Sequence, residues 1–338
     1  MERLPKFTAA AVQAAPIFLD RKATVEKACH LIKEAGKNGA ALAVFPEAYI
    51  PTFPYWPRAL PHPDRELSLD VYAQLYEEAV EIPSPEVDQL CAAAKEAGIY
   101  VIVGMTEREI GVSATMFNTL LFIHKSGEVL GKHRKLVPTF EERCIWGQGD
   151  GSDLRVYPTE VGKLSGLICG NNLMTLVKYA LLAKGEQIHA AVWPSLGRMK
   201  NYVDLCSRNY ALEGQVFVIV SSGYITEDMV PDTFSLKKKT HWDVAGGSGI
   251  VGPNGEYVAG LVYDRKEIIY ADIDLRDIVK NKAIHDVVGH YARPDVVSLL
   301  LREEPYSLIQ EMKPKGKKEL LEDSNGRSLP FNNRAPNR

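Results

Sequence analysis

Cys169 ends an apolar run, residues 163–169, at a point where a buried strand is expected to stop and a helix to begin. Glu47 follows a comparable run at 43–46, and Lys135 ends another at 129–135. A thiol attacks as its thiolate, so a catalytic cysteine needs a base or a positive charge beside it. Glu47 could supply the base and Lys135 the charge. The three strand ends therefore predict one active site with a thiol nucleophile.

Other chemistries have less support in the sequence. Histidine is the commoner partner of a catalytic thiol, but the eight histidines lie mostly in loop-like or charged contexts, such as His62, His133 and His241. A Gly-x-Ser-x-Gly elbow is absent, and so are Cys-x-x-Cys and His-Glu-x-x-His spacings, so we expect no metal. Residues 247–252 match Gly-x-Gly-x-x-Gly, yet they lead into a strand and hairpin instead of opening a helix. We therefore expect no dinucleotide and no other cofactor.

Composition indicates an ordinary soluble globular protein. The 338 residues are 46% hydrophobic and 25% charged, with a net charge of −3, which gives no global reason to expect nucleic acid or an acidic membrane surface as a partner. The start of the chain lacks the features of a signal peptide, and no run approaches the ~20 apolar residues that span a bilayer. Five widely spread cysteines argue against a disulfide framework, so we expect a cytoplasmic protein.

The hydrophobic pattern alternates between strands and helices, with hairpin signals at 125–128 and 253–256. This order predicts an α/β fold with two mixed sheets, a core between the sheets, and helices on the outer faces. One domain or two fused halves would both fit the length. The expected strands are 6–13, 40–45, 100–103, 117–123, 129–135, 166–169, 190–194, 217–221, 249–251 and 257–262, and the expected helices are 21–38, 85–97, 173–183 and 201–213.

Two segments fall outside this pattern. Residues 49–72 are rich in proline and aromatic residues and predict a loop or partial lid, whose Tyr55 and Trp56 could line a substrate pocket or simply pack. Trp193 and Pro194 end a predicted strand and could border the same pocket. From residue 313 the chain has too few apolar residues to offset the entropy of ordering, so we expect a folded domain over 1–312 and a disordered tail over 313–338.

Five stretches, taken in order, resemble the nitrilase branch of the carbon-nitrogen hydrolases and cover about residues 6 to 300. Two of them, Trp-Gly-Gln-Gly-Asp-Gly and Gly-His-Tyr-x-Arg-Pro-Asp, look more like true nitrilases than the related amidases and carbamoylases. The stretches are Phe45-Pro-Glu-Ala48, residues 134–143 (Arg-Lys-Leu-Val-Pro-Thr-Phe-Glu-Glu-Arg), residues 146–152, Gly166-Leu-Ile-Cys169 and residues 289–295.

The resemblance implies an α-β-β-α sandwich with a Glu-Lys-Cys triad. Glu47 would be the general base, Lys135 the electrophilic stabiliser and Cys169 the nucleophile, while Glu142 would help to position the lysine and the substrate. The implied reaction is hydrolysis of a small nitrile to a carboxylic acid and ammonia through a thioester. The alternatives are an amidase or carbamoylase with the same triad, or a non-catalytic scaffold. Family resemblance also implies a homodimer or a larger spiral homo-oligomer.

One position departs from the family pattern. After the cysteine, nitrilases usually carry Trp-Glu or Gly-Glu, whereas this chain has Gly170-Asn171. One fewer negative charge beside Cys169 should make its thiolate easier to form. We therefore expect Asn171 to contact substrate and to change how a tetrahedral intermediate divides between acid and amide products.

Overall fold

The computed structural model describes residues 4–57, 65–109, 111, 113–194, 196–242 and 245–306. The chain divides into a compact unit, Met1–Glu304, and a second unit, Pro305–Arg338. The predicted tail, 313–338, lies outside the described residues.

The first sheet has the strand order β12-β1-β2-β3-β4-β5. Strands β1, β2 and β3 are parallel to one another. Strand β12 is antiparallel to β1, β4 is antiparallel to β3, and β5 is antiparallel to β4. Strands β2 and β5 therefore run in the same direction, so residues that follow them emerge at one edge of the sheet. The strands are β1 (Lys6–Gln13), β2 (Ala40–Val44), β3 (Tyr100–Arg108), β4 (Met116–Ile123), β5 (Val129–Arg134) and β12 (Glu267–Asp274).

The second sheet repeats this plan in the order β11-β10-β9-β8-β7-β6. Its three central strands, β7, β8 and β9, are parallel, and antiparallel strands flank them. The strands are β6 (Tyr157–Thr159), β7 (Gly162–Ile168), β8 (Ile188–Trp193), β9 (Phe217–Ser222), β10 (Gly246–Val251) and β11 (Tyr257–Tyr263).

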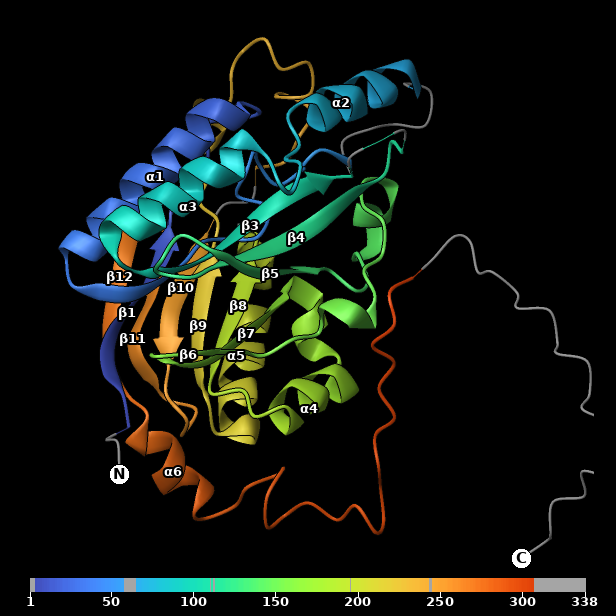
Figure 1. The fold of residues 1–338 in the computed structure, drawn as a ribbon. Helices are drawn as coiled ribbons and strands as arrows, with labels where there is room; N and C mark the ends of the chain where they lie inside the picture. The colour runs from blue at the N-terminus through green and yellow to red at the C-terminus, as the bar shows by residue number, and fades with distance from the viewer. Residues whose placement is uncertain are drawn as a thin grey trace, which may run out of the picture. The chain divides into compact units, whose positions relative to one another are not determined.

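Helices cover the outer faces of both sheets (Figure 1). Helices α1 (Arg21–Lys37) and α3 (Pro85–Ala97) lie side by side on the first sheet, and α4 (Thr175–Ala183) and α5 (Lys200–Gly214) lie on the second. Two further helices are α2 (Arg65–Glu77) and α6 (Arg276–Lys282). The predicted α-β-β-α sandwich of mixed sheets is confirmed.

Alternation along the strands builds two cores at once. In β1, Ala9 and Ala11 belong to the cluster between the sheets, whereas Ala10 and Val12 belong to the cluster under α1 and α3. Successive side chains of a strand point to opposite faces, so a strand buried on both faces must be apolar throughout. Helix α1 packs against this face through buried residues at helical spacing, namely Val25, Ala28, Ile32 and Ala35.

The sequence predicted most of these elements, and the bounds 6–13 and 85–97 are confirmed without change. The predicted loop over 49–72 is wrong in part, because α2 begins at Arg65. Strands β6 and β12 and helix α6 were also missed. The glycine-rich residues 247–252 lie mostly in buried β10, which continues into hairpin partner β11 and opens no helix.

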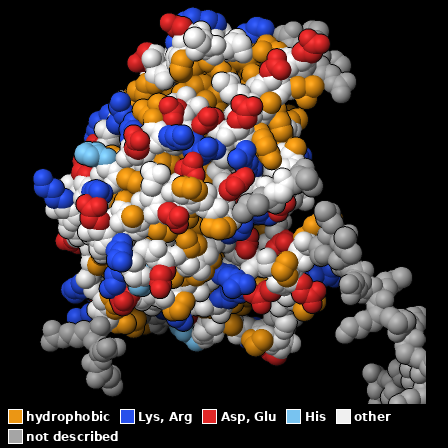
Figure 2. Space-filling model, turned by 45° about the horizontal axis from the view of Figure 1, so that its top comes forward, with side chains coloured by type: hydrophobic (Ala, Val, Ile, Leu, Met, Phe, Trp, Pro, Cys, Tyr) orange, Lys and Arg blue, Asp and Glu red, His pale blue; other side chains and the backbone are white. Residues whose placement is uncertain are grey.

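Within the described part of the chain, no helix combines the length and apolar character needed to cross a membrane. On the face drawn in Figure 2, basic and acidic side chains are interspersed, with apolar side chains between them. This mixture matches the small net charge of the sequence.

Candidate active site

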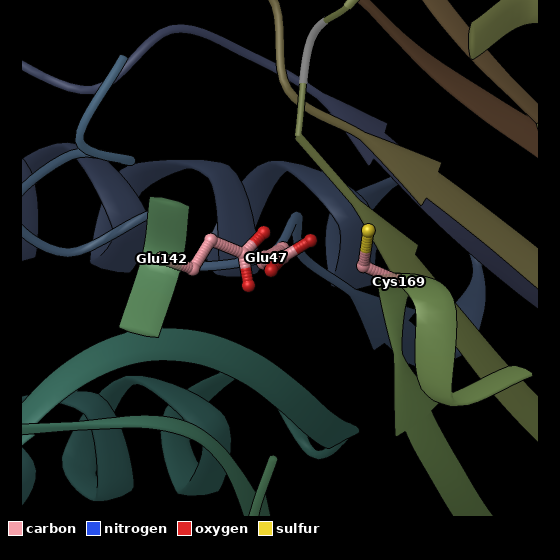
Figure 3. Close-up of side chains that lie close together, drawn as sticks. All are labelled: Glu47, Glu142 and Cys169. Atoms are coloured by element: carbon pink, nitrogen blue, oxygen red, sulfur yellow. The ribbon is translucent and has the colours of Figure 1, made fainter. Parts of the chain in front are cut away.

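Three strand ends meet at one place in the molecule. Glu47 follows β2, Lys135 follows β5 and Cys169 follows β7. The carboxylates of Glu47 and Glu142 and the sulfur of Cys169 offer atoms that all lie within 4.8 Å of one another. Figure 3 shows both carboxylates beside the turn that carries Cys169. The structure thus brings together all four residues predicted to be catalytic.

Lys135 lies at the centre of this group and is fully buried. Its Nζ is 2.7 Å from Oε1 of Glu47 and 2.6 Å from Oε2 of Glu142. Burial lowers the pKa of Lys135, whereas Cys169 in its thiolate form, Glu47 and Glu142 all raise it, and the overall effect is a raised pKa. The lysine therefore remains an ammonium. Two carboxylates and a thiol could also hold a metal ion, but here the ammonium already supplies their positive charge.

The two carboxylate oxygens of Glu47 differ in their hydrogen bonding. Its Oε1 accepts from Lys135 and from Nδ2 of Asn118, at 2.7 Å, whereas Oε2 is buried without a hydrogen-bond partner among the described residues. Burial raises the pKa of Glu47 to about 7; Lys135 opposes this rise and Glu142 adds to it. A buried carboxylate with such a pKa and a free oxygen can act as a base near neutral pH.

Glu142 is held by the start of a short 3₁₀ helix, Phe140–Cys144. The backbone N–H of Thr139 donates to Oε2 of Glu142 at 2.8 Å, as in a capping box, and the same oxygen accepts from Lys135. The carboxylate therefore connects the cap of this helix to the lysine. This geometry supports the positioning role that the family resemblance implied.

Cys169 sits on a sharp turn between β7 and a 3₁₀ helix, Cys169–Leu173. Its φ of 49° is in the left-handed region, which costs a non-glycine residue roughly 1 kcal/mol or more. Burial raises the pKa of the thiol well above its usual value, while Lys135 and the backbone N–H of Gly170 act in the opposite direction. The resting group is thus a thiol, which would have to lose its proton before the sulfur could act as a nucleophile.

Two glycines allow the close backbone contacts that position the charged residues. A Cβ on Gly104 of β3 would lie 2.1 Å from the carbonyl oxygen of Pro46, directly under the Glu47 segment. A Cβ on Gly149 would lie 2.3 Å from the carbonyl oxygen of Arg134, and the Gly149 N–H donates to the carbonyl of Lys135 at 2.9 Å. Larger residues would displace Glu47 or Lys135.

A cavity of about 100 Å³ opens beside Cys169. Of the predicted substrate-binding residues, Tyr55 lines it. Trp56, Asn171, Trp193 and Pro194 are buried but are not among the described residues that line it, so their contact with substrate stays a prediction. The lining consists of Phe53, Pro54, Tyr55, Pro57, Thr139, Glu141, Glu142, Cys169, Leu196, Arg198 and Met199.

Two of these buried side chains, Trp56 and Asn171, have identified partners. Trp56 packs edge-on against Phe18 and Phe234, with ring centroids 6.0 and 5.2 Å away. Asn171 holds the backbone that follows Lys135. Its Oδ1 accepts from Leu136 N at 2.8 Å, and its Nδ2 donates to Val137 O at 3.0 Å. Asn171, two residues after Cys169, therefore links the Cys169 turn directly to the segment that follows Lys135.

Sequence reasoning missed Asn118. It lies inside β4 and is fully buried. Its side-chain amide donates to Glu47, and its backbone carbonyl accepts from the backbone N–H of Lys135 at 2.7 Å. A polar amide inside the largely apolar run 116–123 was the available signal, because a buried amide needs a partner.

The chain is similar to known proteins along most of its length. The family model described as carbon-nitrogen hydrolase matches residues 8–282. "Nitrilase 2" from an unknown prokaryotic organism is 40% identical over 297 residues, which are 88% of this chain and 92% of that protein. The "bifunctional nitrilase/nitrile hydratase NIT4B" of Nicotiana tabacum is 37% identical over 322 residues, covering 90% and 88% of the two chains.

Solved structures agree at the level of the fold. Nit3 of Saccharomyces cerevisiae, described as a member of branch 10 of the nitrilase superfamily, superimposes with a TM-score of 0.68 at 21% identity. The match covers 85% of this chain and 96% of that one.

Proposed function

This chain belongs to the carbon-nitrogen hydrolase family, in its nitrilase branch, and we propose that it hydrolyses an organic nitrile to a carboxylic acid and ammonia. One observation carries the proposal: a buried ammonium, Lys135, is held by two carboxylates beside the Cys169 sulfur. That arrangement supplies a nucleophile, a base and a fixed positive charge without a cofactor.

The first step is attack of Cys169 on the nitrile carbon. The free Oε2 of Glu47 takes the thiol proton as the C–S bond forms. Negative charge then develops on the nitrile nitrogen, and the Lys135 ammonium, already oriented by Glu47 and Glu142, stabilises it. The proton held by Glu47 passes to that nitrogen, which gives a thioimidate.

Two waters complete the reaction. Glu47 activates the first water, which adds to the thioimidate and gives a tetrahedral intermediate. Protonation of its nitrogen expels ammonia and leaves a thioester. A second water, activated by the same carboxylate, releases the acid and regenerates the thiol. The sum is one nitrile plus two waters giving one acid and one ammonia.

The tetrahedral intermediate has a second exit. If the thiol leaves before ammonia, the product is the amide, and we propose that Asn171 influences this division because it links the Cys169 turn to the Lys135 segment. Glutamate at this position would keep an acceptor for Leu136 N but lose the donor to Val137 O. Measuring the acid-to-amide ratio of wild type and Asn171→Glu tests this; identical ratios would contradict it.

The main test is a panel of aliphatic, aromatic and arylacetonitrile substrates, each paired with its matched amide, with ammonia release as the readout. We expect turnover of at least one nitrile and a covalent Cys169 adduct by mass spectrometry. Cys169→Ala should give neither. Ammonia from amides but from none of the nitriles would identify an amidase instead. No turnover and no adduct with any compound would favour a non-catalytic scaffold.

We also propose a cytoplasmic homodimer or larger homo-oligomer. Apolar side chains on α5 support self-association, since Tyr202 and Leu205 are 57% and 66% exposed. Light scattering across a concentration series tests the assembly, and a strictly monomeric protein would contradict it.

A further inference from the structure

A chain of buried polar side chains lies behind the Cys169 turn, and the proposed mechanism does not use it. Its members come from β7, β8, α5 and the segments after β7 and α4, and each is at most 2% exposed. Buried polar groups cost free energy unless each finds a partner, and here they hydrogen-bond to one another. The members are Ser165, Asn172, Glu186, His189 and Tyr210.

Asn172 brackets the turn that carries the nucleophile. Its Nδ2 donates to the carbonyl of Cys169 at 3.0 Å and to the carbonyl of Leu167 at 3.2 Å. Both amide hydrogens are thereby committed, one on each side of Ile168. This bracket fixes the backbone where Cys169 adopts its unfavourable left-handed conformation.

The orientation of the Asn172 amide also shows that Nε2 of His189 carries a hydrogen. Because the Asn172 NH₂ faces the two carbonyls, its Oδ1 must face the ring, where it lies 2.8 Å from Nε2 of His189. An amide oxygen only accepts, so Nε2 carries a hydrogen and donates.

Glu186 completes the chain on the other side of the ring. Its Oε1 lies 2.6 Å from Nδ1 of His189, and its two oxygens also accept from Ser165 and, at 2.6 Å, from Tyr210. The hydroxyls of Ser165 and Tyr210 both donate to this carboxyl group, and such donors favour the carboxylate, which only accepts. Nδ1 of His189 then donates to Glu186, while its Nε2 donates to Asn172. The Tyr210 ring stacks on the His189 ring at 3.8 Å.

One peptide unit connects this hydrogen-bonded chain to the Cys169 sulfur. The Cys169 carbonyl accepts from Asn172, and the backbone N–H of Gly170 at the other end of that peptide lowers the pKa of the Cys169 thiol and so favours its thiolate. Hydrogen bonds in a chain polarise one another. A donor at the carbonyl therefore strengthens the N–H that faces the sulfur.

We propose that Glu186, His189 and Asn172 are positioning residues that hold and polarise the Cys169–Gly170 peptide, and so set both the direction and the acidity of the nucleophile. The proposal rests on the proposed function only in taking Cys169 as the attacking group.

Two substitutions of His189 form a matched pair. Glutamine places its amide where Nε2 lies and can still donate to Asn172, whereas asparagine reaches only the Nδ1 position and loses Asn172. We expect His189→Asn to lose on the order of 100-fold in kcat, as for a small misplacement of a reacting group, with KM nearly unchanged. His189→Gln should recover most of that loss. Equal losses in both variants would overturn the proposal.

A second readout needs no nitrile. Iodoacetamide alkylation of Cys169, followed across pH with Cys169→Ala subtracted, reports the thiolate directly. His189→Asn should react more slowly and titrate at higher pH than His189→Gln. Ser207→Ala is the control, since Ser207 is buried on α5 but its hydroxyl has no hydrogen-bond partner among the described residues. A failed nitrile panel would leave this result interpretable.

Folding is checked by melting temperature. If the His189 variants do not fold, Glu186→Gln, which removes the negative charge with little change in volume, must show the same slower alkylation. A folded Glu186→Gln that reacts at the wild-type rate would overturn the proposal.

Discussion

The first sheet supplies Glu47 and Lys135 through charged side chains that contact each other directly, whereas the second sheet supplies Cys169 through the geometry of a backbone turn. On the first side, ion pairs of 2.6 to 2.7 Å fix the groups. On the second, Cys169 in its left-handed conformation is held by Asn172, which donates to the carbonyls of Cys169 and Leu167. The first sheet thus positions the charged groups of the site, and the turn after β7 in the second sheet fixes the orientation of the Cys169 side chain.

This difference matters for stability as well as for chemistry. The charged side is a buried network in which each member compensates another, so loss of one leaves the rest unpaired. The thiol side contains a neutral group whose loss leaves no buried charge. Substitutions on the two sides of the site should therefore differ in their effect on stability.

Cys169→Ala should abolish turnover while leaving the fold intact. The nucleophile is lost, but the removed sulfur is uncharged at rest because burial raises the pKa of its thiol. Ammonia release should fall below detection, with a melting temperature close to that of wild type. Cys206→Ala, at the other buried cysteine, is the matched control and should stay active. Substantial turnover by Cys169→Ala would remove Cys169 from the mechanism.

Lys135→Met should abolish turnover and also destabilise the protein. Glu47 and Glu142 would lose their shared cation, and breaking a buried ion pair in this way costs about 3–5 kcal/mol. Urea unfolding would measure the loss. A variant as stable as wild type would show that the two sides of the site do not differ as described.

Glu47→Gln should remove the acid limb of the rate profile. In wild type, kcat/KM should rise as Glu47 loses its proton, around pH 7, because the base must be ionised. The residual activity of the variant should lack that rise. A limb that persists in Glu47→Gln would assign the titration to another group.

The difference in unfolding free energy between wild type and Glu47→Gln should depend on pH with a definite sign. The pKa of Glu47 in the folded protein is raised to about 7, so folding favours its protonated form. This contribution is present below the unfolded pKa and is lost as the pH rises through about 7. The unfolding free energy of wild type should therefore fall relative to that of Glu47→Gln between about pH 5 and about pH 8. The opposite trend would contradict a raised pKa.

Asn118→Ala should have the smallest effect. Its hydrogen bond stabilises the Glu47 carboxylate and lowers the pKa of that group. Without it, the acid limb of kcat/KM should move to higher pH, by about one unit for a hydrogen bond to a charged group. Thr119→Ser, a conservative change at the next position of β4, is the control. An unmoved limb would reduce Asn118 to a packing role.

Three residues of the site could be predicted because each follows a recognisable strand. Glu47, Lys135 and Cys169 follow runs whose apolar pattern requires burial, and chemistry concentrates where such strands end. The family resemblance then added Glu142, which follows no strand and would have passed as a helix cap.

The residues that support them could not be predicted in the same way. Asn118 and His189 lie inside strands, where the sequence shows only a polar residue in an apolar run. Strand β12 was missed for a similar reason, since it exists by pairing with β1, more than 250 residues away. Such contacts depend on register between distant segments.

The sequence by itself determined the sandwich, the three strand ends and the types of group that meet there, because alternation and burial are local properties of the chain. Only the tertiary structure decided that Lys135 sits between two carboxylates, that Asn171 binds the backbone after Lys135, and that Asn172 holds the Cys169 turn. The physical reason is that hydrogen-bond geometry and desolvation depend on which segments lie within a few ångströms in space. Two sheets must pack face to face before those distances exist.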